Sequence, residues 1–185
     1  MADERSLVLQ RQRQLKWKSL DWLEALLMML CGFTLAAFSL SVVCDIVTRE
    51  IGHPWLWLQE VTSTFFIYGI FFGAAVATRR NDHLYLAAVG DSMTGRPRQA
   101  IETAIRVVVI VVGLFLTYYG YINFLRGFSS FRMPSMTPIA SLYAAIPISG
   151  ALIALFAFEQ LVNGWKNGFE PRPEDLLPEE GIGSP

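Results

Sequence analysis

Side chains that could move a proton or bind a charged solute are scarce in the apolar parts of this sequence. Charged residues make up 17% of the 185 positions and hydrophobic residues 53%. The ionisable residues that border the long apolar stretches all lie near the ends of those stretches: Asp21, Glu24, Asp45, Glu60, Glu102, Arg106 and Glu159. There they can reach headgroups or water, whereas a charge at mid-depth in a membrane costs on the order of 3 kcal/mol. The pattern argues against an ion or proton pathway built by this chain alone.

The cysteines and histidines are poor candidates for a metal or haem site. Cys31 and Cys44 are thirteen residues apart in one apolar stretch, which on a helix separates them by roughly 20 Å. His53 and His83 fall on opposite sides of the membrane in the topology derived below, so they cannot share one metal. We therefore expect no metal, no cofactor and no enzymatic activity. The net charge of -1 also leaves no basic surplus for binding nucleic acid.

The elements that carry these residues are four charge-free stretches, at 25–44, 61–78, 107–125 and 133–158. A hydrocarbon core of about 30 Å needs about 20 helical residues, and lipid offers the backbone no hydrogen-bond partners. The sequence therefore predicts an all-α integral membrane protein. Its four transmembrane helices are expected at about 22–46, 58–78, 101–124 and 139–162. Pro134 and Pro138 should lie outside the fourth helix.

Lysine and arginine residues indicate how the chain is oriented in the membrane. Eleven of them lie in the two terminal segments and the second loop, against three in the other two loops. Both termini are therefore predicted to be cytoplasmic. We expect a basic cytoplasmic tail over 1–20, a transmembrane domain over 21–163 and a Pro-rich, acidic, disordered cytoplasmic tail over 164–185. Residues 81–95 have the spacing of a short cytoplasmic helix on the membrane surface.

Small residues recur at intervals of four in two of the expected helices. The second helix has Gly69, Gly73 and Ala77, and the fourth has a similar series from Ser141 to Ser149. Such faces let helices approach closely in lipid. The partner of each face can be another helix of this chain or a second protein.

Two acidic residues have simple structural interpretations. Glu102 stands four residues before Arg106, which predicts an ion pair along one helix. Glu60 follows Trp55 and Trp57 at the start of the second span, where aromatic side chains suit the membrane interface. Anchoring there is the simpler role for Glu60, and contact with a partner subunit is the alternative.

The stretch from Arg49 to Leu84 combines several ordered features. An Arg and a Gly follow the first span, a Trp precedes the acidic residue of the second, and Phe72-Gly73-Ala74-Ala75 is followed by Arg79-Arg80 and His83. In these features the sequence resembles the small permease subunit, the Q component, of TRAP (tripartite ATP-independent periplasmic) transporters. It departs from the family at Gln59, where paired acids are often found. By similarity the family-motif and partner-interface candidates are Trp57, Glu60, Gly69, Gly73, Arg79, Arg80 and His83.

The resemblance implies a non-catalytic scaffold subunit of a sodium-coupled transporter that imports an organic acid through the cell inner membrane. In that family a large membrane subunit of about twelve spans carries the substrate and sodium sites and moves like an elevator. A periplasmic substrate-binding protein delivers the substrate, and the small subunit holds the large one in the lipid bilayer. Uncharged helix centres suit such a role.

Two other classes of protein stay open at this stage. An autonomous small four-helix exporter would need a carboxylate within a span, and Glu24 is the nearest candidate. The strong Lys/Arg bias argues against the dual insertion found in such exporters. A four-helix redox membrane subunit would need paired intramembrane histidines or external cysteine pairs, which the sequence does not supply.

Overall fold

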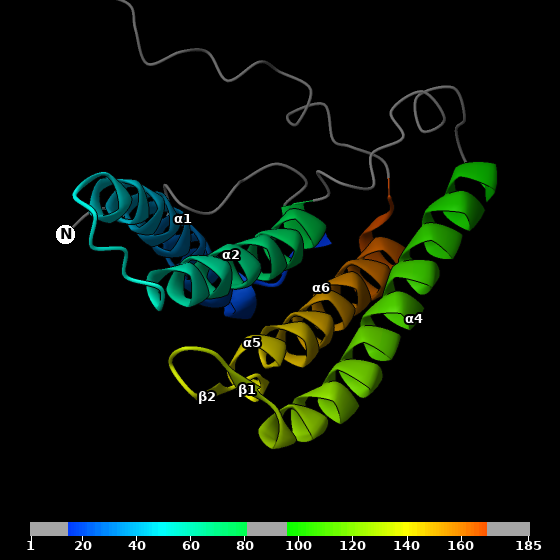
Figure 1. Ribbon diagram of the computed structural model, residues 1–185. Coiled ribbons are helices and arrows are strands. Elements are labelled where there is room, and N and C mark those ends of the chain that lie inside the picture. Colours follow the sequence, from blue (N-terminus) through cyan, green and yellow to red (C-terminus); the bar gives the residue numbers. More distant parts are fainter. Residues whose placement is uncertain (1–14, 81–95, 170–185) are drawn as a thin grey trace, which may run out of the picture.

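The computed structural model describes residues 15–80 and 96–169 (Figure 1). Four helices within these ranges are long and apolar enough to cross a membrane, which confirms the expected all-α membrane fold. They are α1 (Asp21–Glu50), α2 (Leu58–Arg80), α4 (Arg96–Arg126) and α6 (Ala145–Asn167). The shorter elements are η3 (Lys18–Leu20), η4 (Gly127–Ser129), β1 (Phe131–Arg132), β2 (Thr137–Pro138) and α5 (Ala140–Tyr143). The surface helix expected within 81–95 and most of the expected C-terminal tail lie outside the described residues.

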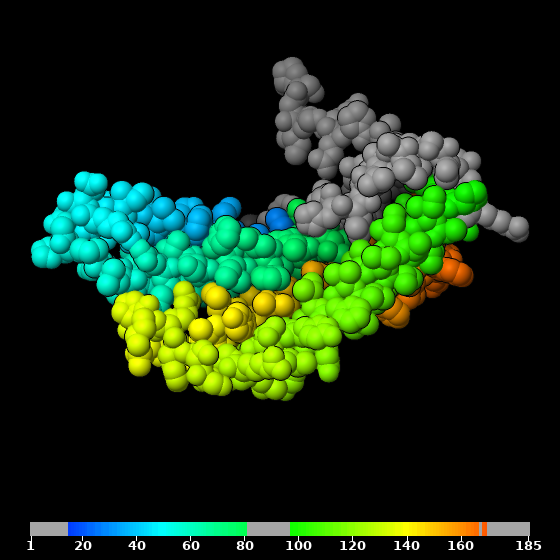
Figure 2. Space-filling model, turned by 45° about the vertical axis from the view of Figure 1, so that its right-hand side comes forward, coloured from blue at the N-terminus to red at the C-terminus, as the bar shows by residue number. Residues whose placement is uncertain are grey.

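The helices pack in a row whose order differs from their order in the chain. Helix α1 packs on α2, α2 on α6, and α6 on α4, so that α1 and α4 form the two edges (Figure 1). The α1–α2 connection and the β1–β2 hairpin between α4 and α6 lie toward one end of an elongated molecule, and the start of α4 and the end of α6 lie toward the other (Figure 2). Because each helix has at most two long neighbours, the buried core is small. It consists of Leu27, Ala75, Val76, Ile153 and Phe156.

Glycines allow α4 and α6 to pack backbone against backbone. A Cβ atom on Gly150 of α6 would lie 2.7 Å from the backbone nitrogen of Thr117. One on Gly120 of α4 would lie 2.9 Å from the nitrogen of Pro147. Neither position has room for a side chain, so the close approach depends on glycine.

The small residues of α2 face α1 of the same chain. A Cβ on Gly69 would come within 3.2 Å of the Thr34 hydroxyl oxygen, and one on Gly73 within 3.6 Å of the Cys31 sulfur. The Cys31 thiol also lies 3.8 Å from the Gly69 carbonyl oxygen, to which it donates a weak hydrogen bond. Within this chain, the Gly69–Gly73 face of α2 therefore packs against α1.

The fourth apolar stretch is interrupted at Ala144, between α5 and α6. Pro147 explains the break, because it lacks the N–H that would bond to the Tyr143 carbonyl and its ring crowds that carbonyl. Tyr68 of α2 donates a 2.7 Å hydrogen bond to the Ser141 carbonyl beside the break. Pro134 and Pro138 lie in the β1–β2 hairpin and therefore outside the helix, as expected.

Gly150→Ala should destabilise the chain by about 1–3 kcal/mol, because its methyl group would be forced against the backbone of α4. Gly32→Ala on α1 is the matched control, since a Cβ there meets nothing within 4 Å. The control should be neutral or slightly stabilising, because alanine favours helices over glycine. Thermal unfolding in detergent, followed by circular dichroism, measures both. Equal losses of stability in Gly150→Ala and Gly32→Ala would contradict close α4–α6 packing.

Candidate functional site

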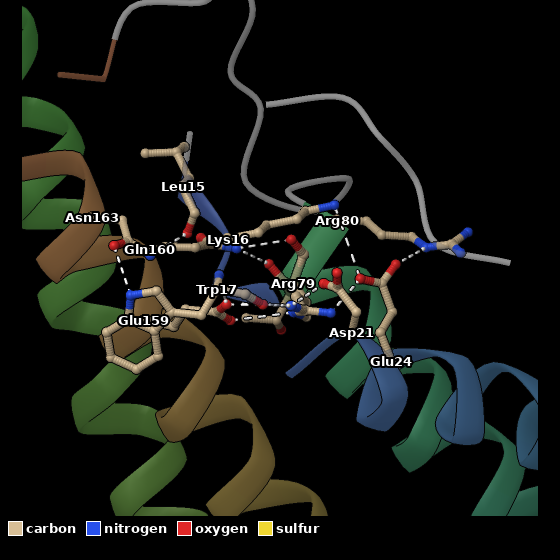
Figure 3. A network of polar contacts seen from close by, with 11 residues as sticks. Leu15, Lys16, Trp17, Asp21, Glu24, Arg79, Arg80, Glu159, Gln160 and Asn163 are labelled. Atoms are coloured by element: carbon tan, nitrogen blue, oxygen red, sulfur yellow. Dashed lines mark hydrogen bonds and ion pairs between the residues drawn. The ribbon is translucent and has the colours of Figure 1, made fainter. Parts of the chain in front are cut away.

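The largest fully buried side chain in the described ranges belongs to Arg79, in the last turn of α2. Its guanidinium group contacts carboxylates from two other helices (Figure 3). Nη1 lies 2.6 Å from Glu24 and Nη2 lies 3.0 Å from Asp21, both on α1. Nε lies 3.2 Å from Glu159 on α6. One side chain therefore ties three helices together.

The geometry of this contact suits arginine and not lysine. Nη2 of Arg79 also donates to the Trp17 carbonyl at 3.1 Å and to the second oxygen of Glu159 at 3.3 Å. A guanidinium presents five N–H donors in a rigid plane, whereas an ammonium is a compact point charge with three. Arg79 also lies over the Phe156 ring, with 5.5 Å between its central carbon and the ring centroid.

Two further cations complete the cluster around Glu24. Lys16 Nζ lies 4.0 Å from one Glu24 oxygen, and Arg80 Nε lies 3.1 Å from the other. Three cations, including Arg79, thus meet the three carboxylates. This balance matters because Glu24 is fully buried, and a buried charge is tolerated only when it is paired and hydrogen-bonded.

Amide and indole groups hold the surroundings of the cluster in place. The Gln160 side-chain amide donates to the Thr78 and Arg79 carbonyls at 2.8 and 3.0 Å, which satisfies acceptors in the last turn of α2. The Trp17 indole donates to Asn163 at 2.8 Å, and Asn163 donates to the Leu15 carbonyl at 3.1 Å. The sequence assigns residues 1–20 to a tail, but its described part from Leu15 onward packs against α6 (Figure 3).

The cluster has the chemistry of a structural joint. Most of its charged oxygens and nitrogens bond to one another, and it lies in the first turn of α1 and the last turn of α2. A buried and internally neutral cluster offers a solute neither net charge nor open coordination. No group of three or more His, Cys, Asp or Glu residues suited to a metal is found in the described ranges.

A second polar cluster lies at the opposite end of α2. Glu60 accepts hydrogen bonds from the Ser135 backbone N–H at 3.2 Å, from the Ser135 hydroxyl, and from the Thr137 hydroxyl at 3.3 Å. Arg132 donates to the Glu60 carbonyl and to Thr64, at 3.0 Å each. Glu60 therefore fastens the β1–β2 hairpin to α2. The adjacent Trp57 stacks on Trp55, with ring centroids 5.9 Å apart.

The described candidates from the sequence all lie on or beside α2, but they do not form one site. Arg79 and Arg80 meet in the buried cluster, while Trp57 and Glu60 lie at the other end of the helix. His83 lies outside the described residues. A partner-interface role for these residues stays a prediction.

Sequence reasoning missed the partners of Arg79. It placed Glu24 and Glu159 near headgroups, whereas both are fully buried. The predicted topology could have indicated these partners, because it places Glu24 and Glu159 on the same side of the membrane as Arg79. The expected ion pair of Glu102 with Arg106 is confirmed.

The comparisons with known proteins concern most of this helical region. The family model of the tripartite ATP-independent periplasmic transporters, DctQ component, matches residues 38–167. The chain belongs to this family. The DctQ match covers α2, α4 and α6, and with them Arg79 and Glu159 of the buried cluster.

Two curated relatives support membership of the DctQ family. The sialic acid TRAP transporter permease protein SiaT of Haemophilus influenzae is 25% identical over 122 residues, which are 64% of this chain and 19% of SiaT. The sialic acid TRAP transporter small permease protein SiaQ of Vibrio cholerae is 21% identical over 131 residues, which are 67% of this chain and 75% of SiaQ. The chain thus spans about a fifth of the length of SiaT and three quarters of that of SiaQ.

Arg79→Gln should cost about 3–5 kcal/mol of stability, because it leaves buried carboxylates without their main partner. Arg49→Gln is the matched control, since Arg49 is exposed and pairs only along α1 with Asp45. Arg49→Gln should lower the free energy of unfolding by less than about 1 kcal/mol. Unfolding free energies in mixed micelles measure both, and similar values for the two variants would contradict the joint.

Proposed function

We propose that this chain is the non-catalytic scaffold subunit of a sodium-coupled TRAP transporter that imports an organic acid. Membership of the DctQ family supports a role as the small permease subunit. The observation that carries the scaffold role is the confinement of charge to the helix ends. Arg79 forms ion pairs within the chain, and Glu60, at the opposite end of α2, accepts hydrogen bonds within the chain.

The row of helices fits a passive, supporting role. An elevator-type subunit can move across the membrane only if another part resists it in the bilayer plane. Four helices side by side widen that fixed part more than a compact bundle would. The edge helices expose large apolar side chains, such as Phe33 and Leu40 on α1 and Val108 and Phe115 on α4. These surfaces suit lipid or the helices of a larger membrane subunit.

The proposed partners are a large membrane subunit of about twelve spans, a periplasmic substrate-binding protein and the bilayer itself. The N- and C-termini are proposed to face the cytoplasm. Since both relatives are named as sialic acid transporter components, sialic acid is the first substrate to test. Its carboxylate places it within the proposed class of organic acids.

The geometry gives no support to an autonomous exporter. Such a protein would need a carboxylate that takes up and releases a solute or proton. Glu24, the nearest candidate, is fully buried and contacts Arg79, Arg80 and Lys16. Freeing the Glu24 carboxylate to bind a solute or proton would break several ion pairs at once.

Co-expression with the large membrane subunit and binding protein from the same genome tests the proposal. The chain should co-purify with the large subunit. Proteoliposomes with all three proteins should accumulate radiolabelled sialic acid, or another organic acid, under an inward sodium gradient. Omitting this chain should reduce uptake to near background. Full uptake without it, or transport by this chain alone, would overturn the scaffold assignment.

A further inference from the structure

A groove follows the seam between α4 and α6, near the start of α4 and the end of α6. It comprises two cavities of about 370 and 350 Å³ that share Thr103 and Trp165 in their linings. The other lining residues are Gln99, Ala100, Gly164 and Phe169 in the first cavity and Leu161 and Val162 in the second. The lining is therefore largely apolar, with polar side chains toward one end.

The depth of the groove follows from the charge pattern of α4. The charge-free stretch 107–125 is roughly 28 Å long at 1.5 Å per residue, which matches a hydrocarbon core of about 30 Å. On this scale Thr103 lies roughly 6 Å, and Gln99 roughly 12 Å, beyond the edge of the hydrocarbon. The exposed indole of Trp165 suits this interfacial level. The groove thus passes from the hydrocarbon edge into the headgroup layer.

The same end of the hairpin carries a surplus of positive charge. The charged side chains that the structure describes there are Arg98, Arg106 and Lys166 against Glu102. Glu102 is already paired with Arg106. Among the described side chains at this end, Arg98 and Lys166 leave a net positive charge, which complements an anion.

Two buried arginine nitrogens at this end lack an acceptor. The side chains of Arg98 and Arg106 are 8% and 3% exposed, and the Nε of each has no hydrogen-bond partner. The guanidinium of Arg106 lies 4.8 Å above the ring of Phe169, which lines the groove. The two guanidinium groups add fixed positive charge close to this end of the groove, which favours an anion there.

From these observations we propose that the α4–α6 groove binds one anionic phospholipid. The first part of an acyl chain lies along Leu161 and Val162 at the hydrocarbon edge, the lipid backbone lies beside Trp165, and the phosphate lies beside Gln99 and Lys166. A zwitterionic lipid has the same chains but no net charge to offer the basic end. The proposal requires only the folded chain and is independent of its place in a transporter.

Titration of the delipidated full-length chain in detergent tests the proposal, with phosphatidylglycerol and phosphatidylcholine as the two probes. Native mass spectrometry counts bound lipids, and thermal unfolding gives their stabilising effect. One phosphatidylglycerol should be retained at least fivefold more tightly than phosphatidylcholine. Equal retention of the two lipids, or binding of neither, would overturn the proposal.

Two tryptophan variants test whether the lipid binds in the groove. Ala100→Trp fills the first cavity and should weaken phosphatidylglycerol binding at least tenfold. Ala104→Trp, one turn further along α4 and exposed but outside the lining, should leave binding unchanged. Retained binding by Ala100→Trp would place the lipid elsewhere and refute this site.

Charge variants test the headgroup end without filling the cavity. Lys166→Gln should weaken phosphatidylglycerol binding about fivefold. Arg126→Gln, at the opposite end of α4, should not change it. If Lys166→Gln has no effect, or if a cysteine probe at Ala100 crosslinks to the large membrane subunit even with excess lipid, the groove is a protein contact and the proposal fails.

Discussion

The buried guanidinium of Arg79 is the constraint on which the helix arrangement depends. A charge in a low-dielectric interior must be neutralised and hydrogen-bonded, and among the described residues its acceptors come from more than one helix. The carboxylates therefore come from α1 and α6, together with the Trp17 carbonyl from the segment before α1. Helix α6 links the α1–α2 pair to α4, so the contacts of Arg79 with Glu159 also join the two halves of the row.

Helix α2 is held differently along its length. Ion pairs of Arg79 fix one end and hydrogen bonds to Glu60 fix the other, while glycine contacts with α1 fix its middle. This division follows from membrane physics, because strong polar contacts form where the charged groups can be assembled near the interface. Close packing of small residues replaces them within the hydrocarbon.

Local patterns predicted the four spans, the Glu102–Arg106 pair and the position of α2, because each depends on residues near one another in the sequence. The partners of Arg79 could not be found this way, since periodicity does not say which helices become neighbours. The small-residue search also missed Gly113 and Gly120, which are seven apart and therefore outside a four-residue motif. The break at Ala144 could have been predicted from Pro147, because a proline within a helix disrupts the preceding turn.

The shallow row also determines how freely the sequence can diverge. In the most apolar 18-residue window of each span, 39% of the residues are buried within the chain for α6, against 11% for α4. A lipid-facing position accepts almost any apolar side chain, whereas a buried one must keep its volume. Sequence change should therefore be rapid along α4 and slow along the inward side of α6, which fits a match to a TRAP small permease protein at only 21% identity.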